Sequence, residues 1–152
     1  MDDDFLDPLS GSCICLTFRR TAHLTTQFYD QMLAPAGVTI RQYSMLVIIS
    51  EHDHLSIKEA AVLFKLDRTT LSRNLKPLER EGWIEIQTGE DRRSRQIILT
   101  GKGRATVMKA TPMWQEAQKR MLAVLGQENW QEIRQTLDRA NTALAFSLSE
   151  LF

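Results

Sequence analysis

The stretch DRTTLSRNLKPLEREGW, residues 67–83, combines hydroxyl, amide and cationic side chains with regularly spaced leucines. Leu71, Leu75 and Leu78 recur at the spacing of one helix face, so this face is predicted to be buried. In the major groove of DNA, arginine binds guanine edges, hydroxyls bind several bases, and the threonine methyl contacts thymine. The polar face therefore has the composition of a recognition helix in a helix-turn-helix. The predicted DNA contacts on it are Arg68, Thr69, Thr70, Ser72, Arg73, Asn74 and Lys76.

A solvated helix face would show the same polar residues, and for an isolated basic helix it is the more common explanation. The neighbouring segments favour DNA. After Gly82, WIEIQT alternates apolar and polar residues, GEDRRS is typical of a turn, and RQIIL predicts a second strand. A hairpin with a cationic tip beside such a helix is typical of a winged helix, whose tip contacts phosphates or the minor groove. Pro77 either bends the helix beyond these contacts or is simply tolerated.

The rest of the chain predicts helices around this unit. A first helix is expected over residues 12–33, because Pro35 and Gly37 would stop it. The further predicted helices are one from the N-cap Thr39 to near Glu51, one from a Ser56–Glu59 capping box to about Phe64, one from Asp67 to Glu81, a long one from Thr100 with a bend at Pro112, and a last one after Gly126. The predicted fold class is mainly α with a small β-hairpin wing.

Composition sets bounds on the class of protein. A chain of 152 residues, 43% hydrophobic and 25% charged, suits one compact domain or a small domain with a helical arm. The acidic start MDDDFLDPLSGS lacks the basic and apolar regions of a secretory signal, so a cytoplasmic protein is expected. Residues 1–11 are expected to form a flexible lead. No apolar run reaches the length of a membrane span.

The formal net charge of zero hides an uneven distribution. Residues 65–104 contain ten cationic and six acidic residues, a net charge of +4, and the remainder of the chain therefore carries −4. An anionic partner would experience the field of the basic segment rather than the average over the chain.

Two long segments, LSIKEAAVLFKLDRTTLSRNLKPLEREGWIEI and GEDRRSRQIILTGKG, resemble the MarR family of winged-helix transcriptional regulators. The similarity lies in the leucine, glutamate and glycine pattern before the wing, the acidic and double-arginine wing tip, and the LT..G entry to the next helix. In order of elements it extends over about residues 12 to 150.

The resemblance implies a homodimer that binds a pseudo-palindromic DNA operator and usually represses. Residues 12–38 and 104–152 would form the dimerisation region, and residues 39–103 the DNA-binding domain. It also implies a wing-tip pair of Asp91 and Arg93, with Arg92 and Arg95 on phosphates. Apolar residues of the last helix independently indicate a surface for a partner chain: Trp130, Ile133, Leu137, Ala140, Leu144 and Leu148. Packing within the chain would bury part of the same face.

Two sensing mechanisms remain open. In hydroperoxide-sensing relatives, a reactive cysteine near the start of the first helix is activated by tyrosines. Cys15, with Cys13 close to it, resembles that cysteine, and Tyr29 resembles one of the tyrosines. Ile40 stands where the second tyrosine would be. Arg19 and Arg20 would instead favour the thiolate, or the cysteine is a small buried apolar residue. The alternative is an aromatic or carboxylate effector between aromatic walls and cations; the residues expected to bind it are Phe18, Arg19, Arg20, His23, Tyr43 and Trp114.

Catalysis, cofactors and metals are not indicated. The chain lacks a Gly-rich phosphate loop and a nucleophile elbow, so the protein is predicted not to be an enzyme. The histidines of HDH, residues 52–54, do not have the i, i+4 spacing of a helical metal site. The competing function is a winged helix used only for protein contacts, because a fold does not by itself assign a function.

Overall fold

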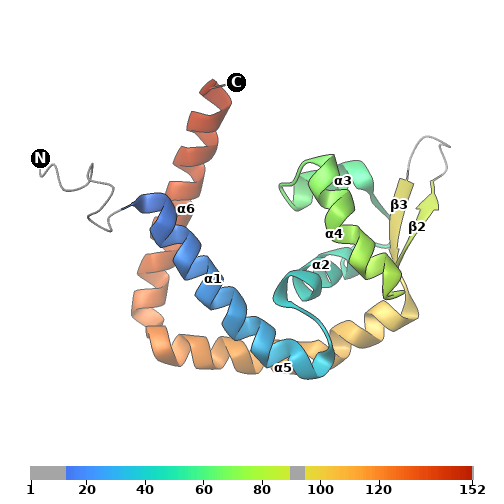
Figure 1. The fold of residues 1–152 in the computed structure, drawn as a ribbon, viewed down its shortest axis with the longest axis horizontal. Helices are drawn as coiled ribbons and strands as arrows, with labels where there is room; N and C mark the ends of the chain where they lie inside the picture. The colour runs from blue at the N-terminus through green and yellow to red at the C-terminus, as the bar shows by residue number, and fades with distance from the viewer. Residues whose placement is uncertain (1–12, 90–94, 152) are drawn as a thin grey trace, which may run out of the picture. The chain divides into compact units, whose positions relative to one another are not determined.

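The computed structural model describes residues 13–89 and 95–151, and of Leu151 only its place in a helix (Figure 1). The elements are α1 (Ile14–Leu33), the 3₁₀ turn η2 (Ala34–Ala36), α2 (Ile40–Ser50), β1 (Leu55–Ser56), α3 (Ile57–Leu63), α4 (Arg68–Arg80), β2 (Ile84–Thr88), β3 (Arg95–Leu99), α5 (Gly101–Leu125) and α6 (Gln127–Leu151). The predicted class, mainly α with a small β-hairpin wing, is confirmed. The expected lead at residues 1–11 and the wing-tip residues Asp91, Arg92 and Arg93 lie outside the described residues.

The described residues up to Trp114 form one compact unit, and those from Gln115 onward form a second. The first contains every element from α1 to β3 and the first part of α5. Within the described residues, no single helix is both long and apolar enough to cross a membrane. Only a pair bent by 70°, Ile14–Ala36 with Ile40–Ser50, passes that test on length and composition.

Reciprocal capping boxes define where α2 and α3 begin. Thr39 accepts a hydrogen bond from the backbone N–H of Gln42, and the Gln42 side chain accepts one from the Thr39 N–H. Ser56 and Glu59 form the same reciprocal box at the start of α3. Both boxes satisfy N–H groups that a helix terminus would otherwise leave without a partner. The predicted helix starts are therefore confirmed.

The sheet is antiparallel with the strand order β1-β3-β2. Strands β2 and β3 form the predicted hairpin, with Ile86 paired to Ile97 and Thr88 paired to Arg95. Strand β1 was not predicted, because it has only two residues, too few to show an alternating pattern, and the second of them is the capping residue Ser56. It pairs Leu55 with Ile97 and thereby ties the start of α3 to the wing.

The core of the first unit lies beneath α4. The side chains of Leu71, Leu75 and Leu78 are fully buried, as their spacing predicts. They share one cluster with Leu46 of α2 and Ile97 of β3. Because α4 is held by this apolar face, its opposite face has a fixed direction and stays exposed.

Candidate nucleic-acid interface

The exposed face of α4 carries most of the residues predicted to contact DNA. One open surface hollow is lined by Arg68, Thr69, Ser72, Arg73 and Lys76, all of them exposed. Thr69 and Arg73 lie one turn apart and point away from the buried leucines at the 3.6-residue period of the helix. The face presents cations and hydroxyls and no large apolar side chain. It therefore suits a polyanion with hydrogen-bonding groups, such as the edges and phosphates of a DNA groove.

Thr70 makes a contact within the chain in addition to the DNA contact predicted for it. Its hydroxyl donates to Asp67 Oδ2 at 2.6 Å, and its N–H donates to Asp67 Oδ1 at 2.9 Å. These two bonds, the hydroxyl bond first, hold the pKa of Asp67 below its usual range. The Thr70 hydroxyl proton is thus engaged in the cap of α4, and a contact of Thr70 with DNA stays a prediction. Asn74 is half-buried at the edge of the polar face.

Arg80 belongs to the same outward stripe and was not among the predicted contacts. Its side chain is 78% exposed, and its Nε lies 3.9 Å from Glu81 Oε1. At the helical period, the side chains of Thr69, Arg73 and Arg80 lie on one side of α4. The predicted contacts end at Lys76, before Pro77, although the predicted helix extends to Glu81; α4 does continue through Pro77 to Arg80.

The hairpin contributes one predicted contact that can be placed. Arg95 is the first residue of β3, is exposed, and pairs with Thr88 in the ladder. It directly follows residues 90–94 in the sequence, which include Asp91, Arg92 and Arg93 and are outside the described residues. The roles of these four residues stay predictions.

The residues predicted to bind an effector lie in two kinds of surroundings. Phe18 and its neighbours Arg19, Arg20 and His23 are exposed on α1. Tyr43 is buried in the core instead, with its ring centroid 6.1 Å from that of Trp114 and its hydroxyl 3.1 Å from Thr111 Oγ1. The structure therefore brings Tyr43 and Trp114 together, and packing with this hydrogen bond accounts for their positions.

The two cysteines lie at the start of α1 and are both free and exposed. Within a single chain Cys15 is therefore not buried, and the two alternatives for it stay predictions for the homodimer. Tyr29 is 14 positions further along the same helix, which separates the two by about 21 Å along its axis. Tyr29 of the same chain therefore does not donate a hydrogen bond to the Cys15 thiol. Tyr29 is instead buried, and burial raises its pKa.

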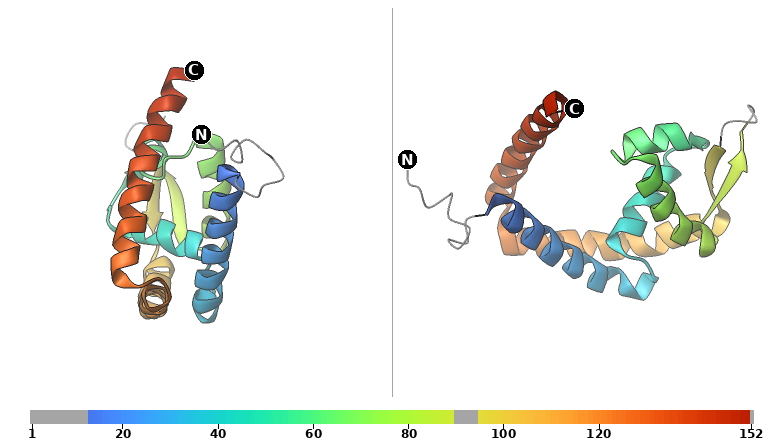
Figure 2. Two further views of the ribbon diagram at one scale, coloured as in Figure 1. Left: turned by 90° about the vertical axis from the view of Figure 1, so that its left-hand side faces the viewer. Right: turned by 45° about the horizontal axis from the view of Figure 1, so that its top comes forward.

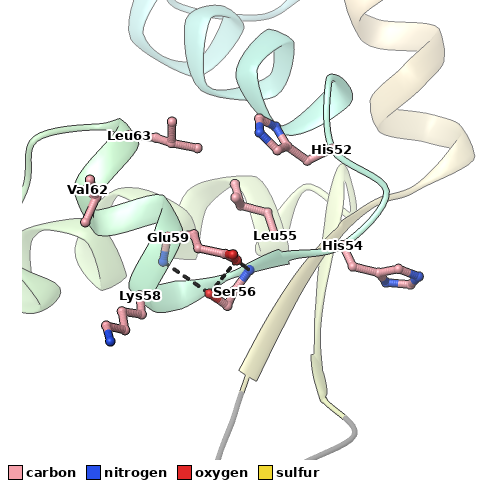
Figure 3. A pocket seen from close by; sticks show the side chains of 8 residues that line it. All are labelled: His52, His54, Leu55, Ser56, Lys58, Glu59, Val62 and Leu63. Atoms are coloured by element: carbon pink, nitrogen blue, oxygen red, sulfur yellow. Dashed lines mark hydrogen bonds between the residues drawn. The ribbon is translucent and has the colours of Figure 1, made fainter.

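A second hollow contains the two histidines of HDH (Figure 3). It is lined by His52, His54, Leu55, Ser56, Lys58, Glu59, Val62 and Leu63. The Ser56 hydroxyl donates to Glu59 Oε2 at 2.6 Å, and this bond is the main reason that the pKa of Glu59 is lowered. The two histidine rings point in different directions in Figure 3. Among the described residues, no group of three or more His, Cys, Asp or Glu side chains is arranged to hold a metal ion.

The sequence of this chain is similar to those of known transcriptional regulators. Residues 36–94 match the sequence profile described as the MarR family. The chain is 36% identical over 100 residues to the transcriptional regulator TtmR of Methylorubrum extorquens, and 32% identical over 91 residues to the organic hydroperoxide resistance transcriptional regulator of Bacillus subtilis. These matches cover 64% and 59% of this chain and only 51% and 62% of the two relatives.

A solved structure is similar over almost the whole chain. The Mycobacterium tuberculosis transcriptional regulator MosR, crystallised in complex with DNA, has a TM-score of 0.80 and 36% sequence identity, over 89% of this chain and 98% of MosR. All three relatives are named as transcriptional regulators, in agreement with the prediction that the chain is not an enzyme. The chain belongs to the MarR family of winged-helix transcriptional regulators.

Proposed function

We propose that this protein is a cytoplasmic, sequence-specific regulator that binds double-stranded operator DNA as a homodimer. The observation that carries the proposal is the exposed cationic and hydroxyl face of α4, directly opposite three fully buried leucines. The DNA complex formed by MosR, which is 36% identical, supports it.

In this proposal the first turns of α4 enter the major groove. The guanidinium groups of Arg68 and Arg73 donate paired hydrogen bonds to guanine edges, and the Ser72 hydroxyl bonds to a neighbouring base. Lys76, Arg80 and the wing arginines bind phosphates, which sets position and contributes affinity without carrying sequence information. In the predicted wing-tip pair, Asp91 does not bind phosphate itself but orients Arg93 towards the DNA.

Dimerisation is supported by apolar side chains that each compact unit leaves exposed. In α1, Ile14, Leu16 and Leu24 are 69%, 60% and 58% exposed. In α6, Leu144 and Leu148 are 56% and 57% exposed. Monomeric proteins rarely expose so much clustered apolar surface. A two-fold dimer would present two copies of α4 about 34 Å apart, one turn of DNA, and would therefore select a pseudo-palindromic site.

Selection of bound sequences from random duplex DNA tests the proposal. We expect enrichment of an inverted repeat with half-site centres about 10 base pairs apart. An Arg73→Ala variant run beside the wild type should lose preference at a defined position of each half-site. If no sequence is enriched and the protein does not bind duplex DNA at low salt, the alternative of a pure protein-interaction module gains support.

We further propose that the regulator responds to a signal, by one of two routes. The exposure of Cys13 and Cys15 supports a redox response, and the B. subtilis relative is named for organic hydroperoxide resistance. A planar carboxylate bound beside Phe18, Arg19, Arg20 and His23 is the second route. Release of DNA by mild peroxide in the wild type but not in Cys15→Ser would favour the first; an equal response of both would discard it. A screen of aromatic acids for a raised melting temperature tests the second.

A further inference from the structure

The C-terminal end of α4 is closed by its own backbone, but three carbonyl groups there need outside donors. The N–H of Trp83 donates to the Leu78 carbonyl at 3.0 Å, and the N–H of Gly82 donates to the Glu79 carbonyl at 2.9 Å. Gly82 has the positive φ of 71° that this Schellman arrangement requires. The carbonyls of Glu81, Gly82 and Trp83 then point beyond the helix and remain to be satisfied.

The first turn of α5 and the residue before it supply these donors. Lys102 Nζ donates to the Glu81 carbonyl at 2.6 Å. The Thr100 hydroxyl lies 2.7 Å from the Gly82 carbonyl and 3.1 Å from that of Trp83, and the Thr100 N–H donates to the Trp83 carbonyl at 3.0 Å. The Thr100 oxygen also accepts the Gly103 N–H at 3.0 Å, so one side chain caps α5 and the end of α4 together.

The two backbones are packed as closely as a glycine allows. A Cβ atom at Gly103 would come within 2.1 Å of the Trp83 carbonyl oxygen, well inside van der Waals contact. A Cβ at Gly101, in the same helical turn, would meet nothing within 4 Å. The close approach therefore occurs at Gly103 and not at Gly101 of the same turn. We call this contact between the end of α4 and the start of α5 the joint.

We propose that Lys102 and Thr100 are positioning residues that fix the direction of the recognition helix α4 for DNA binding. The inference rests on the proposed function. Helix α4 has 13 residues and is about 20 Å long. A tilt of about 10° at the joint would move its N-terminal turns by about 3.5 Å, close to the spacing of adjacent base pairs along a strand. Loss of the joint should thus misalign Arg68 and Arg73 with their bases.

Positioning and phosphate binding make different predictions for Lys102. The Lys102 ammonium occupies the negative end of the α4 dipole, where it stabilises the helix terminus. A residue acting through α4 alters binding to the selected sequence and leaves non-specific binding unchanged, because non-specific binding depends on phosphate neutralisation. A direct phosphate contact would instead lower affinity for every sequence and reduce the salt slope by about 1.

The experiment compares Lys102→Met, Lys102→Arg and the control Lys109→Met, which removes the same charge from an exposed position two turns along α5. Dissociation constants are measured on the selected duplex and on an unrelated duplex, over a range of salt, at a temperature where circular dichroism shows every variant folded. We expect Lys102→Met to bind the selected duplex about tenfold more weakly, equivalent to about 1.4 kcal/mol. Its binding to the unrelated duplex and its salt slope should be unchanged, and Lys102→Arg should restore most of the difference.

A second pair of variants tests the close approach. Gly103→Ala should also lower the preference for the selected duplex, whereas Gly101→Ala should leave it unchanged. Faster hydrogen exchange at the Thr100 amide in Lys102→Met would show the joint loosening without reference to DNA.

The proposal is overturned if Lys102→Met matches the wild type on the selected duplex, or if it loses affinity equally on both duplexes with a smaller salt slope. Should the wild type itself bind no duplex, the proposed function fails and this inference falls with it. That result is distinguishable from a binding wild type whose Lys102 variant is unaffected.

Discussion

At the scale of single residues, the start of α4 depends on Asp67. Its carboxylate accepts hydrogen bonds from both the N–H and the hydroxyl of Thr70. An N-cap of this kind satisfies donors that would otherwise be left at the helix terminus. The cap also fixes the first turn of α4, where Arg68 and Thr69 lie.

The depressed pKa of Asp67 predicts a pH dependence. Because the folded-state pKa lies below the unfolded value, the cap contributes stability at neutral pH. That contribution is lost as the pH falls from the unfolded pKa through the folded one. Asp67→Ala should therefore lower the free energy of unfolding at pH 7 and show less loss on acidification than the wild type. Urea titrations at several pH values measure this, and Asp67→Ser, which retains a capping oxygen, should lie between the two. Parallel curves for Asp67→Ala and the wild type would contradict the assignment.

Arg73 is the most direct test of the polar face at this scale. Arg73→Ala should weaken binding to the selected duplex by about 1–3 kcal/mol and relax the preference at one base position. Arg41 is exposed on α2, outside α4 and the hairpin, so Arg41→Ala serves as the matched loss of charge. Fluorescence anisotropy at fixed salt gives both values. Equal losses for the two variants would mean that Arg73 contributes only charge.

At the scale of elements, local chemistry in the sequence predicted most of the fold. The capping boxes at Thr39 and Ser56 and the leucine spacing of α4 are signals within one turn of helix, so sequence alone is sufficient for them. Lys65 lies between the helix predicted to end at about Phe64 and the one predicted from Asp67, and nothing in its side chain indicates the positive φ of 50° that it adopts. In this conformation Lys65 closes α3: its N–H donates to the Val62 carbonyl at 3.1 Å, and the Leu66 N–H donates to the Ala61 carbonyl at 3.0 Å.

The candidate site also contains some features that local sequence patterns predict and others that they do not. Its polar face follows from periodicity, because burying Leu71 and Leu75 exposes Arg73. The bonds of Thr70 to Asp67 follow from their three-residue spacing, which is as local a signal as the polar composition that predicts a DNA contact. The bonds from Lys102 and Thr100 to the end of α4 join residues 17 to 21 positions apart, and no local pattern predicts them.

The buried face of α4 gives a stability prediction for the element. Leu75 is fully buried, so Leu75→Ala should cost about 2–5 kcal/mol in the free energy of unfolding, from lost burial and the remaining cavity. Val62, which is 73% exposed on α3, provides the comparison, and Val62→Ala should change stability by no more than about 0.5 kcal/mol. Chemical denaturation followed by circular dichroism distinguishes them. A small effect at Leu75 would contradict its place in the core.

At the scale of the whole molecule, the first compact unit contains the candidate interface, and α6 belongs to the second. Figures 1 and 2 show α4 as a helix of the first unit, next to α3 in the chain and followed by the β2–β3 hairpin. Pseudo-palindromic recognition requires two copies of α4, and hence a second chain. The exposed apolar side chains of α1 and α6 form the surfaces proposed to bind this second chain.

Charge placed on the exposed stripe of α6 should separate the subunits. Leu144→Glu is expected to convert a dimer into monomer at micromolar concentration, because dimerisation would bury an unpaired carboxylate. Thr142→Glu adds the same charge on the other side of the helix and should leave the dimer intact. Light scattering coupled to size exclusion measures the mass directly. A wild type that is monomeric at all concentrations, or a dimer that tolerates Leu144→Glu, would contradict the proposed interface.

The central claim is that the polar face of α4 binds duplex DNA in a sequence-dependent manner. The measurement that tests it most directly is a titration of the wild-type protein with the selected duplex and an unrelated duplex across a range of salt. The account predicts that affinity for both falls linearly with salt on logarithmic axes, with the selected duplex bound at least about 10³-fold more tightly at physiological salt. Equal affinity for the two duplexes, or no binding at low salt, would contradict it.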